Sequence, residues 1–295
     1  MATIAVRRPG VAVRPARAPE ERANLLLNLL AYAALLAMAI VMFVPFLWSI
    51  TTSLKTSPEA SQFPPTLLPR QVTLSAYQTV ILGAPFFRWF QNSALVAAAV
   101  VAFRTLFDTM AGYAFARMRF PGRDTLFAVV LGTMMVPGIV LFVPRYIVVL
   151  NLGLVNTLHA LWVPFAADAF GVFLMRQFFE SIPVELEEAA RIDGASRVRM
   201  FWQVIVPNAR PALTVLAINA FQSSWNNFID ALIFISGSNR DSFTLPLGLA
   251  QFQNFYYTDW PVVMAMSVLT TVPIALVYLF FQRYFVEGIA RTGIE

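Results

Sequence analysis

The feature that most constrains this chain is the recurrence of long apolar runs that carry very few charges. They cover residues 25–50, 92–116, 125–149, 157–179, 211–235 and 261–285. A helix needs about 20 apolar residues to cross a hydrocarbon core of about 30 Å, and each run is long enough. A helix also satisfies its own backbone hydrogen bonds, which lipid cannot do. The sequence therefore predicts an all-α membrane protein with six transmembrane helices.

Composition excludes an ordinary soluble enzyme. Of the 295 residues, 58% are hydrophobic and 13% are charged, whereas soluble domains carry about 45–50% apolar and about 25% charged residues. The chain has no cysteine, and His159 is its only histidine, so thiolate metal sites are excluded and a histidine-based catalytic centre has one candidate. We expect no catalytic residue and no metal site in this chain.

The basic residues indicate which side of the membrane each segment faces. If the arginine-rich N-terminus is cytoplasmic and the spans alternate, fifteen Lys or Arg residues lie inside, five lie outside and Arg104 lies within a span. This asymmetry is the positive-inside signature, and it places both termini in the cytoplasm of a plasma (inner) membrane protein. The placement of these residues by membrane side explains the net charge of +5. We therefore expect membrane lipid around this chain and no nucleic acid partner.

These assignments divide the chain into five consecutive parts. We expect a cytoplasmic tail (1–24), a first transmembrane helix (25–50), a proline-rich external loop with short helical pieces (51–91), a five-helix core (92–285) that includes a cytoplasmic loop (181–210), and a cytoplasmic C-terminal tail (286–295).

The cytoplasmic loop 181–210 holds the densest charge in the chain. Pro183 suits the first turn of a helix and Gly194 suits its C-terminal stop, and a second short helix is expected over 195–203. By periodicity alone, the segment also fits a solvated amphipathic helix on the membrane face.

Its residues are more specific than its periodicity. Glu188, Ala189 and Ala190, then Gly194 four residues later, then Val204, Val206 and Pro207 resemble the EAA loop of permease subunits of binding-protein-dependent ABC importers. Valine stands where the motif usually has Ile and Leu. The segments QNSALV, YAFARMRFPGR, MMVP, LGLVNT, SWNNF, TLPLGL and QRYFVEG are similar to the carbohydrate branch of that family, which includes sugar and glycerol-3-phosphate permeases.

The resemblance implies a type I ABC importer permease fold and a set of partners. These are a second permease in a heterodimer, two ATPase subunits and an external substrate-binding protein. The EAA loop would dock on an ATPase through Glu188, Ala189, Ala190, Asp193, Gly194 and Pro207. ATP and Mg²⁺ belong to the ATPase subunits, because a phosphate-binding loop needs glycines before a lysine, and the sole lysine, Lys55, has none before it in SLKT. We expect no cofactor on this chain.

Polar residues also recur inside the expected spans. A stripe in the fifth span consists of Asn219, Gln222, Ser223, Asn226, Asn227 and Asp230. Lipid penalises such a stripe, so it faces either the translocation path or neighbouring helices. Arg104, Asp108 and Asp168 have similar depths in their spans, and we expect them to pair as buried structural charges, with direct contact to an anionic or polyol substrate as the alternative.

Two functions are compatible with six such spans. The residues favour a permease subunit of an ATP-driven importer for a sugar or related polyol. A self-sufficient channel or secondary carrier is the alternative, and the EAA loop discriminates against it, since such a protein has no ATPase to contact.

Overall fold

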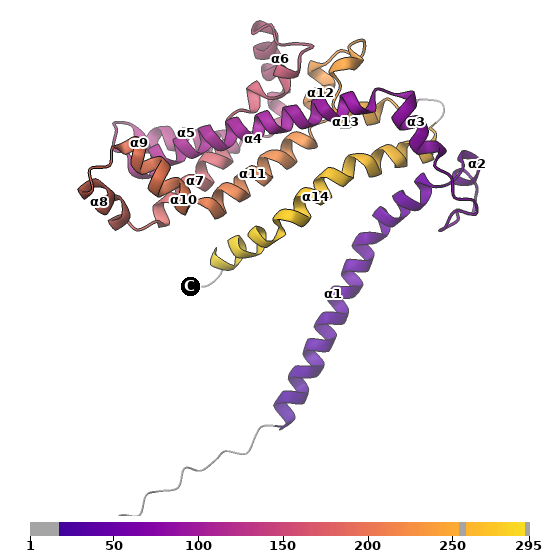
Figure 1. Cartoon of the computed structure of the whole chain (residues 1–295), viewed down its shortest axis with the longest axis horizontal. Helices are drawn as coiled ribbons and strands as arrows, with labels where there is room; N and C mark the ends of the chain where they lie inside the picture. The colour runs from indigo at the N-terminus through magenta and orange to yellow at the C-terminus, as the bar shows by residue number, and fades with distance from the viewer. Residues whose placement is uncertain (1–17, 254–257, 293–295) are drawn as a thin grey trace, which may run out of the picture. The chain divides into compact units, whose positions relative to one another are not determined.

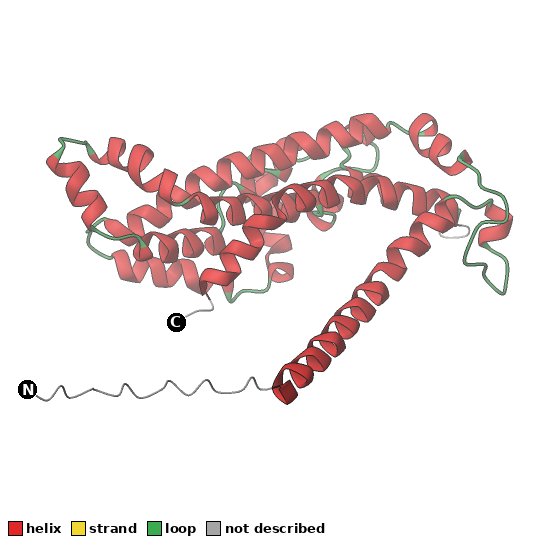
Figure 2. Ribbon diagram, turned by 60° about the horizontal axis from the view of Figure 1, so that its bottom comes forward, coloured by secondary structure: helices red, strands yellow, loops and turns green. Residues whose placement is uncertain are grey.

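The computed structural model describes the backbone of residues 18–253 and 258–292 and the side chains of residues 27–253 and 258–282. Within these ranges the chain is helical and forms no strand (Figure 2). It divides into two compact units, Met1–Trp48 and Ser49–Glu295. The first holds most of α1 (Ala18–Ser53), whose side chains are exposed from Leu27 to Leu47. An apolar helix that buries nothing within its own unit fits a lipid or subunit environment.

The second unit contains the remaining helices. They are α2 (Ser57–Ala60), α3 (Ser75–Gly83), α4 (Phe86–Arg117), α5 (Arg123–Met134), η1 (Gly138–Leu141), α6 (Phe142–Asn151), η2 (Leu158–Leu161), η3 (Val163–Phe165), α7 (Ala169–Ser181), α8 (Glu185–Ile192), α9 (Arg197–Met200), the π-helical turn η4 (Phe201–Ile205), α10 (Val206–Asn208), α11 (Arg210–Trp225), α12 (Ile229–Phe234), η5 (Arg240–Ser242), α13 (Leu245–Ala250) and α14 (Trp260–Thr292).

Helix α4 is the central element of this unit. It packs against α7 and α11, and α11 packs in turn against α14 (Figure 1). Two glycines permit the close approach of α4 and α7: a Cβ at Gly112 would lie 2.6 Å from Met175 Cβ, and one at Gly171 would lie 1.9 Å from Asp108 Oδ2. Small residues at such crossings are the usual device of membrane helices, where close packing replaces the hydrophobic effect.

The described residues contain four helices long and apolar enough to cross a membrane, or up to six if each of two bent pairs is one span. The prediction of six transmembrane helices is therefore confirmed only in part. The third span bends by 98° between α5 and η1, because Pro137 lacks an N–H and disfavours helical backbone at Val136. The fourth begins as 3₁₀ turns and is α-helical only from Ala169.

The fifth span is also interrupted. Helix α11 ends at Trp225 and α12 begins at Ile229, and the Asn227 side chain accepts a hydrogen bond from the Asp230 N–H at 3.3 Å. A short polar side chain competes for backbone groups in this way, which is a reason that a helix stops. A second bend, of 81°, lies before this span, between Asn208 and Arg210.

Some predicted boundaries differ from the observed ones. Helix α4 begins at Phe86, within the predicted external loop 51–91, and α14 continues to Thr292, within the predicted C-terminal tail 286–295. Most of the predicted N-terminal tail lies outside the described residues, and the described backbone is helical from Ala18.

Side-chain hydrogen bonds hold the external segment that contains α2. Glu59 Oε1 accepts the Arg70 N–H at 2.8 Å and the Thr66 hydroxyl at 3.1 Å, and the Lys55 ammonium donates to the Thr66 carbonyl at 2.5 Å. The Arg70 N–H in particular stabilises the carboxylate and lowers the pKa of Glu59. Ser57 donates to Asp259, just before α14, so this segment is attached to the sixth span.

The sidedness of the helices can be tested directly because the chain has no native cysteine. Ser238 is exposed between α12 and α13, and Pro121 is exposed between α4 and α5. We expect an impermeant maleimide to label Ser238→Cys on intact cells and Pro121→Cys only after permeabilisation. The reverse pattern would invert the proposed topology.

Candidate functional site

The EAA loop (residues 181–210) forms the short helix α8 and a longer helical stretch that begins with α9, and a tight turn joins the two. Helix α8 ends at Ile192, and Gly194 follows with a φ of +78°. The Ala195 N–H donates to the Ala190 carbonyl at 2.9 Å, and the Gly194 N–H donates to the Arg191 carbonyl at 3.1 Å. These two bonds form a Schellman motif, whose left-handed residue is most often glycine. The predicted stop of the first helix at Gly194 therefore agrees with the observed geometry.

The second half of the loop is one longer helical stretch, not the single short helix predicted over 195–203. The Ser196 hydroxyl caps α9 by accepting the Arg199 N–H at 3.3 Å. The helix then passes through the π-helical turn η4 into α10, which contains Pro207. A π-turn adds a residue to the helix and often occurs at functional sites.

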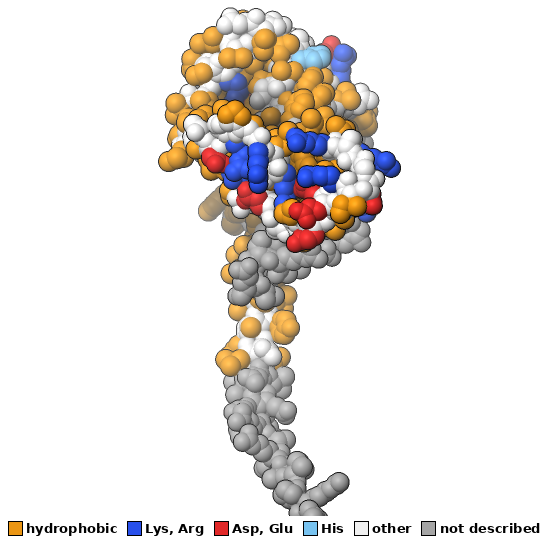
Figure 3. All heavy atoms as spheres, turned by 90° about the vertical axis from the view of Figure 1, so that its left-hand side faces the viewer, with side chains coloured by type: hydrophobic (Ala, Val, Ile, Leu, Met, Phe, Trp, Pro, Cys, Tyr) orange, Lys and Arg blue, Asp and Glu red, His pale blue; other side chains and the backbone are white. Residues whose placement is uncertain are grey.

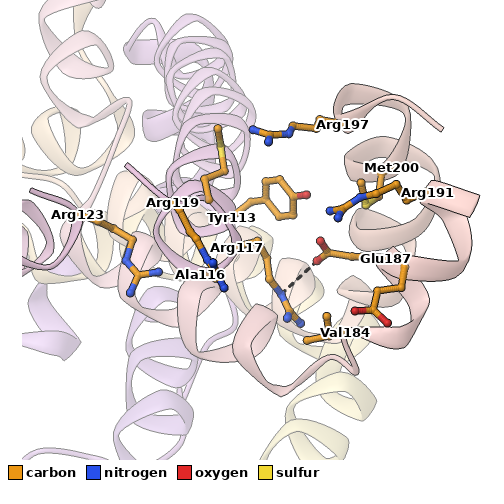
Figure 4. Close-up of a pocket in the computed structure, with 12 residues that line it drawn as sticks. Tyr113, Ala116, Arg117, Arg119, Arg123, Val184, Glu187, Arg191, Arg197 and Met200 are labelled. Atoms are coloured by element: carbon orange, nitrogen blue, oxygen red, sulfur yellow. Dashed lines mark ion pairs between the residues drawn. The ribbon is translucent and has the colours of Figure 1, made fainter. Parts of the chain in front are cut away.

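A buried ion pair attaches the loop to α4. Arg117 Nε lies 3.2 Å from Glu187 Oε1, and the two side chains are only 11% and 9% exposed (Figure 4). Arg117 also donates to the Phe179 carbonyl at 2.6 Å and to the Ile182 carbonyl. These carbonyls lie at the end of α7, where helical C=O groups lack intrahelical partners. Arg117 thus joins three elements: α4, α7 and α8.

An aromatic cluster lies beside this ion pair. Tyr113 of α4 meets Phe179 of α7 edge-on with ring centroids 5.9 Å apart, and meets Phe201 of η4 at 5.0 Å. The core around these rings also includes Met175, Ile182, Ile205, Ala209, Ala212 and Leu216. The loop is therefore packed onto the ends of α4, α7 and α11 as one block, and is not a free surface helix.

The outer face of the loop remains exposed. It presents Glu188, Ala189, Asp193 and Gly194 together with apolar side chains, of which Ile192 is 87% and Val198 is 69% exposed. Ala190 is half-buried. An exposed mixture of small, charged and apolar groups suits a protein partner better than water.

Sequence reasoning missed Arg117 and Glu187. Glu187 and Glu188 are neighbours in ELEEAA, and the sequence does not show which of them is buried. The orientation of α8 buries Glu187 and leaves Glu188 exposed. Arg117 lies in the segment YAFARMRFPGR, whose resemblance to the family was a signal, but no role could be derived from it.

The polar stripe of the predicted fifth span does not lie on one continuous helix. Asn219, Gln222 and Ser223 belong to α11 and are exposed in this chain, Asn226 caps α11 and is exposed, and Asp230 is buried in α12. Asp230 pairs with Arg145 of α6 at 2.5 Å, and the Arg145 guanidinium lies 4.9 Å from the centre of the Phe165 ring.

The predicted pairing of Arg104 with Asp108 or Asp168 is wrong. Among the described residues no carboxylate lies within 4.0 Å of Arg104, which donates to the Phe165 carbonyl at 3.3 Å and the Ser223 hydroxyl at 3.1 Å. Asp108 instead accepts the Asp168 N–H at 2.9 Å, just before α7 begins. The backbone of the broken fourth span supplies one partner to each side chain, and Asp108 Oδ2 is buried without a hydrogen-bond partner among the described residues.

A cavity of about 190 Å³ lies beside Arg104, between residues of α4, η2, η3, α11 and α12. Arg104, Ser223, Ser224, Asn227 and Asp230 supply its polar lining, and Val100, Leu161 and Phe165 supply the apolar part. The Ser224 hydroxyl is buried, and no partner for it lies among the described residues. A cavity with charged and hydroxyl groups at membrane depth is typical of a path for a polar solute.

Comparison with known proteins identifies the family. Residues 108–291 match the family described as the binding-protein-dependent transport system inner membrane component. The chain belongs to this family. It is a permease subunit, a transporter component that is not itself catalytic, and this excludes the self-sufficient channel or secondary carrier.

Individual relatives agree with this assignment. The arabinooligosaccharide transport system permease of Halalkalibacterium halodurans is 35% identical, over 87% of this chain and 92% of that protein. The trehalose/maltose transport system permease of Thermococcus litoralis is 33% identical, over 93% and 99%. A chain of a bacterial ABC transporter that imports the acidic polysaccharide alginate superposes with a TM-score of 0.78 at 26% identity, covering 90% of this chain and 98% of that one.

The buried ion pair gives a first prediction for this site. Removing Arg117 leaves the Glu187 carboxylate uncompensated, which in soluble proteins costs about 3–5 kcal/mol. We expect Arg117→Ala to lower the thermal midpoint of the purified complex and to make the EAA loop sensitive to protease. Arg123→Ala is the matched control, because its partner Asp124 is 76% exposed and such pairs contribute at most about 1 kcal/mol. Equal behaviour of the two variants would contradict the anchoring role.

Asn226 gives a second prediction. Its side chain is exposed in this chain, so a larger apolar residue meets no obstacle here. We expect Asn226→Leu to leave the complex assembled and to reduce transport, because an apolar group then replaces a polar one on the translocation path that the sequence predicts here. Loss of assembly, measured by co-purification of the subunits, would instead place Asn226 in a helix contact.

Proposed function

We propose that this chain is one of two permease subunits of a six-span ABC importer for a sugar or oligosaccharide, with both termini cytoplasmic. Two ATPase subunits and an external binding protein complete the complex. The observation that carries the proposal is the EAA loop, which is rigidly attached to α4 and α7 on one side and fully exposed on the other.

The geometry supports a mechanical role for the loop. Closure of the ATPase subunits moves the exposed face of α8, and the Arg117–Glu187 pair with the Tyr113 aromatic cluster transfers that displacement to α4 and α7. Since packed interfaces do not deform continuously, the helices move with the loop. The path then alternates between its outward and inward openings. ATP and Mg²⁺ act in the ATPase subunits, and this chain supplies no group to that reaction.

The substrate class follows from the relatives. Two similar permeases serve arabinooligosaccharides and trehalose or maltose, and the cavity beside α11 offers hydroxyl, amide and charged groups with the Phe165 ring. Such a lining suits a neutral polyol, which hydrogen-bonds through hydroxyls and stacks its C–H face on an aromatic ring.

The substrate proposal is tested by uptake into proteoliposomes that contain the whole complex. We expect ATP-dependent uptake of arabinooligosaccharides, maltose or trehalose in the presence of the external binding protein, and no uptake without it. Glycerol-3-phosphate serves as the anionic comparison. Uptake that needs neither ATP nor the binding protein would contradict the proposed mechanism.

The coupling role generates a prediction at Gly194 and Glu188. Left-handed backbone costs a β-branched residue roughly 1–2 kcal/mol, and Glu188 is exposed toward the proposed partner. We expect Gly194→Val and Glu188→Lys to keep membrane insertion and to lose substrate-stimulated ATP hydrolysis or the ATPase subunits themselves.

Gly194→Asn is the matched variant, because asparagine tolerates left-handed backbone. A Cβ at Gly194 meets nothing within 4 Å in the described structure. If Gly194→Asn keeps substrate-stimulated ATP hydrolysis, glycine is needed at this position for its backbone conformation. If Gly194→Asn loses that hydrolysis, glycine is needed because the partner subunit approaches it closely. Normal hydrolysis and transport in both Gly194→Val and Glu188→Lys would contradict the coupling role.

A further inference from the structure

A pocket of about 590 Å³ lies between the cytoplasmic end of α4, the start of α5 and the helices α8 and α9. Arginines dominate its lining: Arg117, Arg119, Arg123, Arg191 and Arg197, against the two acids Glu187 and Glu188. In Figure 4, Arg191 and Arg197 extend from the EAA loop toward Tyr113, and Arg117 and Arg119 come from α4 and the segment after it. Residues far apart in sequence thus build one basic pocket.

Two of the five arginines have ionic partners in the chain. Arg117 pairs with Glu187, and Arg123 pairs with Asp124 at 3.0 Å. For Arg119, Arg191 and Arg197 no carboxylate lies within 4.0 Å among the residues whose side chains are described. Five guanidinium groups against two carboxylates leave this lining with a net positive charge, which a bound anion would compensate.

The position of the pocket indicates the source of that anion. Arginines gather at the end of the molecule that carries the EAA loop (Figure 3), which the proposed sidedness places at the inner membrane face. Tyr113 and Ala116 of the spanning helix α4 form one wall, and Met118, Val184 and Met200 add apolar surface. A lipid headgroup at this level meets guanidinium groups, and its glycerol region meets the apolar side chains.

We propose that this pocket binds the phosphate group of an anionic phospholipid of the inner leaflet. The guanidinium fork matches phosphate oxygens in a bidentate geometry. The bound headgroup bridges the α4–α5 turn to α8 and α9, the same elements that the Arg117–Glu187 pair holds together. The inference rests on the proposed sidedness for its leaflet, but on the pocket alone for its phosphate chemistry.

The test uses the purified importer complex in detergent and native mass spectrometry. Short-chain phosphatidylglycerol is titrated against wild type, against the double variant Arg119→Gln with Arg197→Gln, and against Arg199→Gln. Arg199 is the matched control, because it is exposed two residues from Arg197, hydrogen-bonds to Gln203 and does not line the pocket. Arg191 is left unchanged because it lies in α8, the helix whose exposed face is proposed to contact the ATPase subunit.

We expect one phosphatidylglycerol to bind wild type and Arg199→Gln with equal affinity. Each neutralised arginine should weaken binding about fivefold, so the double variant should bind about 25-fold more weakly. Zwitterionic phosphatidylcholine should bind wild type more weakly than phosphatidylglycerol does. Equal binding of phosphatidylglycerol to wild type and the double variant would overturn the proposal.

Two further arms identify the source of the anion. Inorganic phosphate that binds in an Arg119- and Arg197-dependent way, without any lipid adduct, would support the phosphate site and overturn the lipid as its occupant. If the double variant instead releases the ATPase subunits from lipid-free complex, the arginines contact carboxylates of a protein partner and the proposal is wrong. Size-exclusion profiles of wild type, the double variant and Arg199→Gln serve as the control for equal folding.

Discussion

The buried contact between Arg117 and Glu187 is the constraint on which the cytoplasmic half of this molecule depends. A guanidinium and a carboxylate that are each about 10% exposed are costly to bury, and the geometry must compensate for lost hydration. Here the compensation includes two carbonyls at the end of α7. The pair fixes one arrangement of α4, α7 and α8, so the EAA loop and two helices of the core cannot move separately without exposing unpaired charge.

The membrane half follows a different constraint. Polar and charged groups at membrane depth need partners, and in this chain many of those partners are backbone groups freed where helices break. Arg104 donates a hydrogen bond to the Phe165 carbonyl in a 3₁₀ turn. Asp108 accepts a hydrogen bond from the Asp168 N–H, and the Asn227 side chain accepts one from the Asp230 N–H. Of these groups, Arg104, Asn227 and Asp230 line the polar cavity beside α11, so polar side chains that lipid would penalise on a straight span face this cavity.

The sequence was sufficient for the class and family of the protein and for the approximate positions of its candidate spans. Long apolar runs and arginine asymmetry are local signals, and the Gly194 stop is set by backbone conformation at one residue. The helix breaks were not predicted, because the apolar runs around Met135–Pro137 and Asn226–Phe228 are long enough for a span in spite of the proline and the two asparagines. The Arg104 pairing was wrong because depth alone says nothing about backbone carbonyls that a break releases. Arg117 and Glu187 are 70 residues apart in sequence, and only the packing of α4 against α7 brings them together.

The central claim is that the EAA loop and the cytoplasmic end of α4 form one rigid block during transport. The absence of native cysteine permits spin labels at two chosen sites: Arg199 of the loop and Met110 of α4, both exposed in this chain. Pulsed electron paramagnetic resonance on the whole complex then gives the distance between them with and without ATP. We predict the same narrow distance distribution in both states. A shift or broadening in the ATP-bound state would show that the loop moves against α4, and would contradict the account.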